Sequence, residues 1–85
     1  MAEKSFESGI DIQYITRFLR DELALASTGA GEYRYKGIDI RVTPLPPRRL
    51  GSFSMQRNQI DLSGDEGDIK EFEHAFLMRF LSAGG

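Results

Sequence analysis

The sequence predicts a small α+β fold in which two helices pack on one face of an antiparallel meander of three or four strands. Two segments, residues 9–26 and residues 63–82, repeat apolar side chains with the period of a helix. Residues 31–43 instead alternate apolar and polar side chains around a Lys-Gly pair, as a hairpin does. At 85 residues the chain has room for a single core. We therefore expect one domain over residues 1–85 in the order α-β-β-β(-β)-α, with disordered tails at residues 1–7 and 83–85.

Residues 9–26 are predicted to form the first helix. Ser8 can cap its first turn, Asp11 follows three positions later as in a capping box, and the glycines after residue 28 end it. The arc that would face the core contains one carboxylate, Glu22, in addition to the apolar side chains. Those apolar side chains are Ile12, Ile15, Phe18, Leu19, Leu23 and Ala26.

Residues 31–43 predict a β-hairpin whose two-residue turn is Lys36 and Gly37. This turn fixes which residues of the two strands lie opposite each other. Two of the resulting pairs are apolar and two join opposite charges, so a single assumption gives a consistent register. The four cross-strand pairs are Tyr35–Ile38, Tyr33–Ile40, Arg34–Asp39 and Glu32–Arg41.

The segment after the hairpin contains three prolines. Residues 44–47 are predicted to leave the sheet as an extended loop, because proline cannot donate a hydrogen bond to a neighbouring strand. Alternation resumes over residues 50–57, with Phe53 and Met55 facing inward. The alternation then changes phase, which leaves two alternatives: the strand continues through a bulge at residues 57–60, or a second hairpin turn there begins a fourth strand.

The last helix is predicted from a capping box at residues 63–66 and from one apolar stripe. Leu77, Met78 and Leu81 lie outside that stripe, and one small sheet cannot cover them together with it. We therefore interpret these three residues as candidates for contact with another protein or with a second copy of the chain. The stripe itself consists of Ile69, Phe72, Phe76 and Phe80.

Two carboxylates border the predicted core and require partners if they are buried. Glu22 lies within the apolar arc of the first helix, and Glu73 borders the stripe of the second. Arg57 continues the inward phase of the preceding strand. We expect Glu22 or Glu73 to pair with Arg57 or Arg49, as a buried ion pair at the rim between helices and sheet.

Charge is distributed unevenly, although the net charge is only −2. Residues 33–57 carry six basic side chains and one acidic side chain, whereas the segments on either side are acidic. The basic segment is either an anion-binding surface or is paired internally with the acidic helices, and the sequence leaves both possibilities open. Its candidate anion-binding residues are Arg34, Lys36, Arg41, Arg48, Arg49 and Arg57.

Composition excludes several kinds of site. The absence of cysteine excludes a disulfide framework, a thiolate metal site and a cysteine nucleophile, and a single histidine cannot form a polyhistidine metal centre. No apolar run approaches the roughly 18 residues of a membrane span. We predict no catalytic residue, no cofactor, no metal and no membrane partner.

The sequence therefore predicts a non-catalytic, cytoplasmic protein-interaction or accessory module whose partner is an unknown protein or a second copy in a homodimer. Arg48 and Arg49 form the most exposed basic pair and are candidate interaction residues. The alternative is a weak nucleic-acid or anion binder through residues 34–57. The element order is also that of double-stranded-RNA-binding domains, but the turn at 36–37 is too short to enter a minor groove and the second helix begins with acidic side chains.

Overall fold

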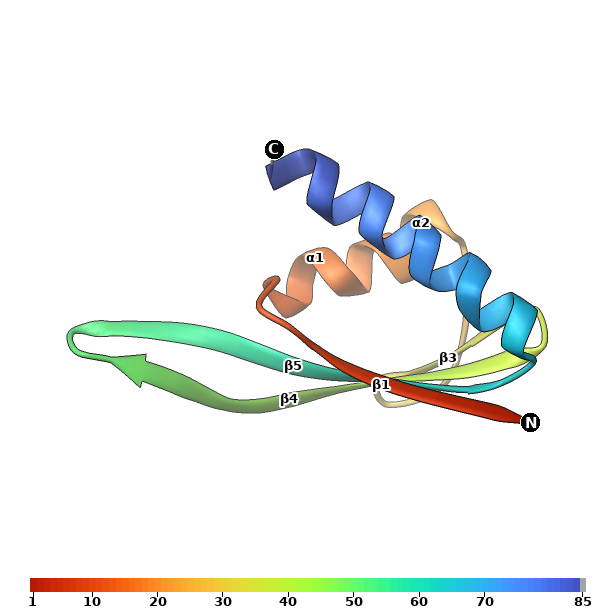
Figure 1. Cartoon of the computed structure of the whole chain (residues 1–85), viewed down its shortest axis with the longest axis horizontal. Coiled ribbons are helices and arrows are strands. Elements are labelled where there is room, and N and C mark those ends of the chain that lie inside the picture. The colour runs from red at the N-terminus through yellow and green to blue at the C-terminus, as the bar shows by residue number, and fades with distance from the viewer. Residues whose placement is uncertain (85) are drawn as a thin grey trace.

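The computed structural model describes the backbone of residues 1–84 and the side chains of residues 1–80 (Figure 1). It confirms the α+β class: the helical segments lie on one face of an antiparallel sheet, which has five strands in the described part of the chain. The strand order is β1-β5-β4-β3-β2, so β2 to β5 form a meander and β1 joins its end. The elements are β1 (Ala2–Ser8), α1 (Ile12–Arg17), the π-helical η1 (Phe18–Glu22), β2 (Ala26–Gly29), β3 (Glu32–Tyr35), β4 (Ile38–Leu50), β5 (Phe53–Gly64) and α2 (Glu66–Gly84).

The N-terminal segment forms β1, where the sequence predicts a disordered tail at residues 1–7. Ala2 lies opposite Gly64 and Ser8 lies opposite Asn58, so the strand pairs with β5 along its whole length. A segment this polar has little local sequence signal for a strand, and it is stabilised by pairing with residues at least fifty positions away. At the other end α2 continues to Gly84, so residues 83 and 84 are helical, and residue 85 lies outside the described residues.

The first helix is shorter than the predicted 9–26. Asp11 caps it in place of Ser8, and the Asp11 carboxylate accepts a hydrogen bond from the Gln13 backbone N–H at 2.8 Å. Helical structure ends with η1, and Ala24 then has a φ of +53°, which cannot continue a right-handed helix. The chain enters β2, whose pairing with β3 could not be foreseen from helical periodicity.

The β3–β4 hairpin has the predicted register, including all four cross-strand pairs. Both opposite-charge pairs form: Arg34 Nη1 lies 3.0 Å from Asp39 Oδ1, and Arg41 Nη2 lies 2.9 Å from Glu32 Oε1. These two pairs lie on the open face of the sheet, because Tyr33, on the opposite side of the strand, is buried in the core.

Beyond the body of the sheet, β4 and β5 continue together as a two-stranded ribbon, which we call the arm and define as residues 43–57 (Figure 1). The prolines of residues 44–47 lie within β4 and do not form the predicted loop. They are tolerated because β3 pairs with β4 only as far as Arg41, so the arm portion of β4 has a neighbour on one side only. The register shift falls between Leu45 and Arg48, opposite Gln56. β5 therefore passes through residues 57–60 without a turn, and the irregularity lies in β4.

The core fills the space between the helices and the covered face of the sheet. The apolar stripe of α2 is buried as predicted, and Phe80 packs against the core while remaining partly exposed. Phe53 and Met55 do not reach the core, contrary to the predicted inward orientation, because the arm extends past the area that the helices cover. The buried apolar residues are Ile15, Phe18, Leu19, Tyr33, Ile38, Ile40, Val42, Ile60, Leu62, Ile69, Phe72 and Phe76.

Candidate functional site

The end of the arm gathers exposed apolar side chains. Leu50 and Phe53 flank its two-residue turn and are 51% and 74% exposed, and Met55 is 50% exposed. Phe53 and Met55 are two positions apart on β5, so their side chains project from the same face of the ribbon. An apolar face with nothing over it is typical of an interaction surface.

The same end of the arm carries unpaired positive charge. Residues 40–60 contain no aspartate or glutamate. Arg48 lies opposite Met55 and therefore shares a face of the ribbon with Phe53 and Met55, whereas Arg49 lies opposite Ser54 and projects from the other face. Both arginines are exposed, and neither forms an ion pair with a described residue. This placement agrees with their prediction as an exposed basic pair.

The other four predicted anion-binding residues already have carboxylate partners. Arg34 and Arg41 pair across the β3–β4 hairpin, and Lys36 Nζ lies 2.5 Å from Glu71 Oε1 on α2. The hydrogen bond from Lys36 lowers the pKa of Glu71 and raises that of Lys36. Arg57 Nη1 lies 3.8 Å from Glu7 Oε1. The basic segment is thus largely paired internally, and its unpaired charge is confined to the arm.

The predicted ion pair between a helix carboxylate and Arg57 or Arg49 does not form. Glu22 instead binds Arg79 on α2, whose Nε lies 2.8 Å from Glu22 Oε1. Glu73 lies 2.7 Å from Lys4 Nζ on β1. Lys4 was missed because the prediction assigned residues 1–7 to a tail, and Arg79 was not considered as a partner of Glu22. All of these side chains are at least partly exposed, so the pairs contribute little to stability.

The predicted contact residues of α2 are partly described. Leu77 and Met78 are exposed, at 47% and 58%. Leu81 lies in α2, but its side chain is outside the described residues. The structure thus separates two apolar surfaces, one on α2 and one on the arm, and sequence reasoning identified only the first.

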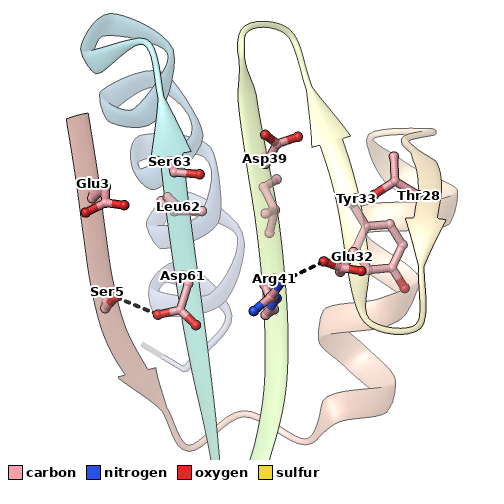
Figure 2. A pocket seen from close by; sticks show the side chains of 11 residues that line it. Glu3, Ser5, Thr28, Glu32, Tyr33, Asp39, Arg41, Asp61, Leu62 and Ser63 are labelled. Atoms are coloured by element: carbon pink, nitrogen blue, oxygen red, sulfur yellow. Dashed lines mark hydrogen bonds and ion pairs between the residues drawn. The ribbon is translucent and has the colours of Figure 1, made fainter. Parts of the chain in front are cut away.

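The open face of the sheet holds a polar hollow of about 460 Å³ (Figure 2). Its carboxylates come from β1, β3, β4 and β5, and most of them accept hydrogen bonds from other side chains of the protein. Asp61 Oδ1 accepts hydrogen bonds from Ser5 Oγ at 2.6 Å and from Gln59 Nε2 at 2.9 Å, and Arg41 binds Glu32. No group of three or more potential metal ligands is assembled among the described residues. This hollow was not predicted, because Glu3 and Ser5 of β1 line one side of it and residues 1–7 were assigned to a tail.

Replacing Ser5 with alanine is expected to raise the pKa of Asp61. The hydrogen bond from Ser5 is the main cause of the lowered Asp61 pKa, followed by the bond from Gln59. Because its pKa is lower in the folded state, Asp61 stabilises the fold above its unfolded-state pKa, and this contribution is lost as pH falls through the folded-state pKa. A carbon-detected NMR titration of the Asp61 carboxyl measures the shift. Ser63→Ala, in the same hollow, is the control, and an unchanged Asp61 pKa in Ser5→Ala would contradict the assignment.

Neither a protein-family model nor a curated protein matches this chain. Within the described residues, no helix is both long and apolar enough to cross a membrane. Function therefore has to rest on the chain's own geometry. Most polar groups of the hollow already bind one another, whereas Arg48 and Arg49 of the arm have no acidic partner among the described residues.

Proposed function

We propose that this protein is a non-catalytic interaction module that contacts another protein through the arm. One observation carries this proposal: at the end of the arm, exposed Leu50, Phe53 and Met55 share a face of the ribbon with Arg48. Arg49 projects from the other face, and neither arginine has an acidic partner among the described residues. Aromatic side chains and arginine are the residues that most often dominate the binding energy of protein interfaces. The arm provides both on a two-stranded, hydrogen-bonded ribbon.

The charge of the arm indicates the chemistry of its partner. A surface with arginines and no carboxylate over residues 40–60 is complementary to an acidic surface. Phe53, the most exposed of the three apolar side chains, is suited to an apolar pocket within such a surface. The cytoplasmic location of the protein stays a prediction.

Binding of single-stranded nucleic acid is the second candidate, and the same residues favour it. An exposed aromatic ring can stack on a base, and the neighbouring arginines can contact phosphates. Only Arg48 and Arg49 of the six predicted basic residues lack a carboxylate partner among the described residues, so few phosphates could be neutralised. Such binding would be weak, and its dependence on salt would be modest, because the slope scales with the number of phosphates neutralised.

Replacing Phe53 with serine is expected to abolish partner retention. The purified chain is immobilised and exposed to extract of its own source cells, and retained proteins are quantified by mass spectrometry. Loss of a central aromatic contact costs about 2 kcal/mol or more, which is roughly a 30-fold loss of affinity. Leu77→Ser is the matched control, because Leu77 is also a large exposed apolar residue but lies on α2.

Three outcomes separate the candidate surfaces. Loss in Phe53→Ser with retention in Leu77→Ser supports the arm. The reverse result would assign the interface to α2 and contradict the proposal. Retention of no protein, together with salt-sensitive binding of a single-stranded oligonucleotide, would favour the second candidate. Circular dichroism of both variants confirms that the fold is intact.

A further inference from the structure

Arg57 lies on the same face of the arm as the exposed apolar side chains. It follows Met55 by two positions on β5, and side chains two positions apart on a strand project from the same face. Arg49 lies opposite Ser54 and projects from the other face. We call the face that includes Arg57 the contact face. It consists of Leu45, Arg48, Leu50, Phe53, Met55 and Arg57.

Where the arm leaves the body, the contact face continues the open face of the sheet. Arg57 and Asp61 are an even number of positions apart on β5, whereas Ile60 has the opposite phase and is buried in the core. Asp61 lines the hollow on the open face (Figure 2), and the helices lie on the opposite side of the sheet (Figure 1). The helices therefore do not cover this end of the contact face, and a partner can reach Arg57 from the same side as Met55.

The Arg57 side chain donates no hydrogen bond within the described part of the chain. Its Nη1 lies 3.8 Å from Glu7 Oε1, which is too far for a hydrogen bond. Its Nε is buried without an acceptor among the described residues, although the side chain as a whole is 32% exposed. Arginine has five N–H donors, and buried donors are nearly always paired in folded proteins. Arg57 is therefore a cation on the contact face whose donors are available for a ligand.

Glu7 holds Arg57 only weakly. The Glu7 side chain is 58% exposed, and exposed ion pairs contribute little to stability. A carboxylate of another molecule can therefore replace Glu7 at small cost. In the free chain, Glu7 competes with such a carboxylate for Arg57.

The side chains of the contact face lie at three levels along the ribbon. The levels are the cross-strand pairs of Leu45 with Arg57, Arg48 with Met55, and Leu50 with Phe53. Successive levels are two residues apart on β5, which corresponds to about 7 Å. Every second side chain of an extended segment has the same spacing. An extended segment that runs along the arm would thus meet one cation, then a second cation, and then a pair of apolar side chains.

We propose that the contact face binds an extended acidic segment of another protein. Two carboxylates, two positions apart on that segment, bind Arg57 and Arg48, and the next alternate side chain is apolar and packs on Leu50 and Phe53. This inference rests on the proposed function and specifies the chemistry of its partner. Arg57 exchanges Glu7 for a carboxylate of the partner.

A synthetic peptide with the pattern Glu-Thr-Glu-Thr-Leu-Thr tests this inference. Its glutamates and its leucine lie on one side when it is extended. Binding to the full chain is measured by NMR titration at about 0.15 M salt, where charges more than about 8 Å apart are largely screened. Arg57→Gln is expected to weaken binding about threefold, the size of effect typical of an exposed ion pair. Glu7→Gln, which removes the competing carboxylate, is expected to strengthen binding by a similar factor.

Two variants are matched controls for these substitutions. Arg49→Gln removes an exposed arginine from the other face of the arm. Glu3→Gln removes an exposed carboxylate from the same strand as Glu7, but Glu3 lies opposite Ser63, at the far end of the β1–β5 pair. We expect no measurable change in affinity for either control. Circular dichroism of the four variants confirms that the fold is intact.

Opposite effects of the substitutions at positions 57 and 7, with no change in the controls, support the inference. Equal losses in Arg57→Gln and Arg49→Gln would overturn it, because net charge alone would then explain binding. Absence of peptide binding would also overturn it. A single-stranded oligonucleotide that binds more tightly than the peptide would assign the contact face to nucleic acid and overturn it as well. The capture experiment with Phe53→Ser is independent of these results, since an arm that does not bind this peptide can still retain a protein.

Discussion

Replacing Phe72 with alanine is expected to destabilise the fold by about 3–5 kcal/mol. Phe72 lies at the centre of the α2 stripe and is 1% exposed. Its ring contacts Phe18 of η1 at 6.4 Å and Tyr35 of β3 at 5.7 Å between centroids. It also contacts Phe76, one turn further along α2, at 6.2 Å. Truncation to alanine removes these contacts and leaves a cavity between α2, η1 and the sheet, which the surrounding rings cannot fill without leaving their present positions.

The size of this effect matters because the domain is small. Domains of this length unfold with a free energy of about 4–13 kcal/mol, so Phe72→Ala removes a large share of the total. Urea unfolding followed by circular dichroism measures the loss. Leu77→Ala on the same helix is the control: Leu77 is 47% exposed, and its truncation is expected to change stability by less than about 1 kcal/mol. Equal effects of the two substitutions would contradict the assignment of the core face of α2.

Local pairs in the sequence were sufficient to predict the central hairpin. Its turn and its four cross-strand pairs lie within ten consecutive residues, and two of the pairs join opposite charges. A shift of the pairing by two residues in either direction would place Arg34 opposite Arg41 or Glu32 opposite Asp39. The α2 stripe was predictable for a similar reason, since its period repeats over several turns of one helix.

Elements whose stability comes from distant partners were not predictable in this way. β1 is mostly polar, with three charged side chains among its seven residues, and only its pairing with β5 defines it as a strand. The prolines of β4 were assigned to a loop because a strand inside a sheet cannot contain them. That rule did not apply, since β3 ends its pairing at Arg41 and the rest of β4 is an edge.

In the candidate site, too, some features follow from the local sequence and others depend on distant packing. Arg48 and Arg49 were predicted as exposed, since the prolines before them marked a departure from the body of the sheet. Phe53 and Met55 were assigned to the core because their alternation shows that they share a face. Alternation does not say whether another element covers that face. Only the length of the arm relative to the helices shows that these two side chains are exposed.

Replacing Gly64 with alanine is expected to destabilise the fold by about 3 kcal/mol or more. Gly64 is the last residue of β5 and lies between β1 and β4. Its φ is +137°, a backbone conformation that residues other than glycine rarely adopt. A Cβ at this position would collide with the Gly37 carbonyl oxygen and would lie 2.9 Å from Ile38 Cα. Both are backbone atoms, so relief requires movement of the β3–β4 turn.

That turn also anchors the start of α2. The Gly37 N–H donates to Asp68 Oδ2 at 3.0 Å, and the Gly37 carbonyl accepts from the Asp65 N–H at 3.2 Å. Displacing Gly37 therefore weakens the attachment of α2 in addition to straining β5. Gly51→Ala is the matched control, because Gly51 also has a positive φ, +64°, but no atom lies within 4 Å of its added Cβ. Its cost is expected to be about 1 kcal/mol, from backbone strain alone.

Thermal unfolding of the two glycine variants separates the two causes. A much lower Tm for Gly64→Ala than for Gly51→Ala would show that the close approach of the Gly37 and Ile38 backbone, together with the more extreme φ of Gly64, costs more than ordinary left-handed strain. Equal shifts would mean that the positive φ alone accounts for both, and would contradict the packing assigned to this corner of the sheet. Because Gly51 lies at the end of the arm, its variant also shows whether strain at the turn reaches the body of the fold.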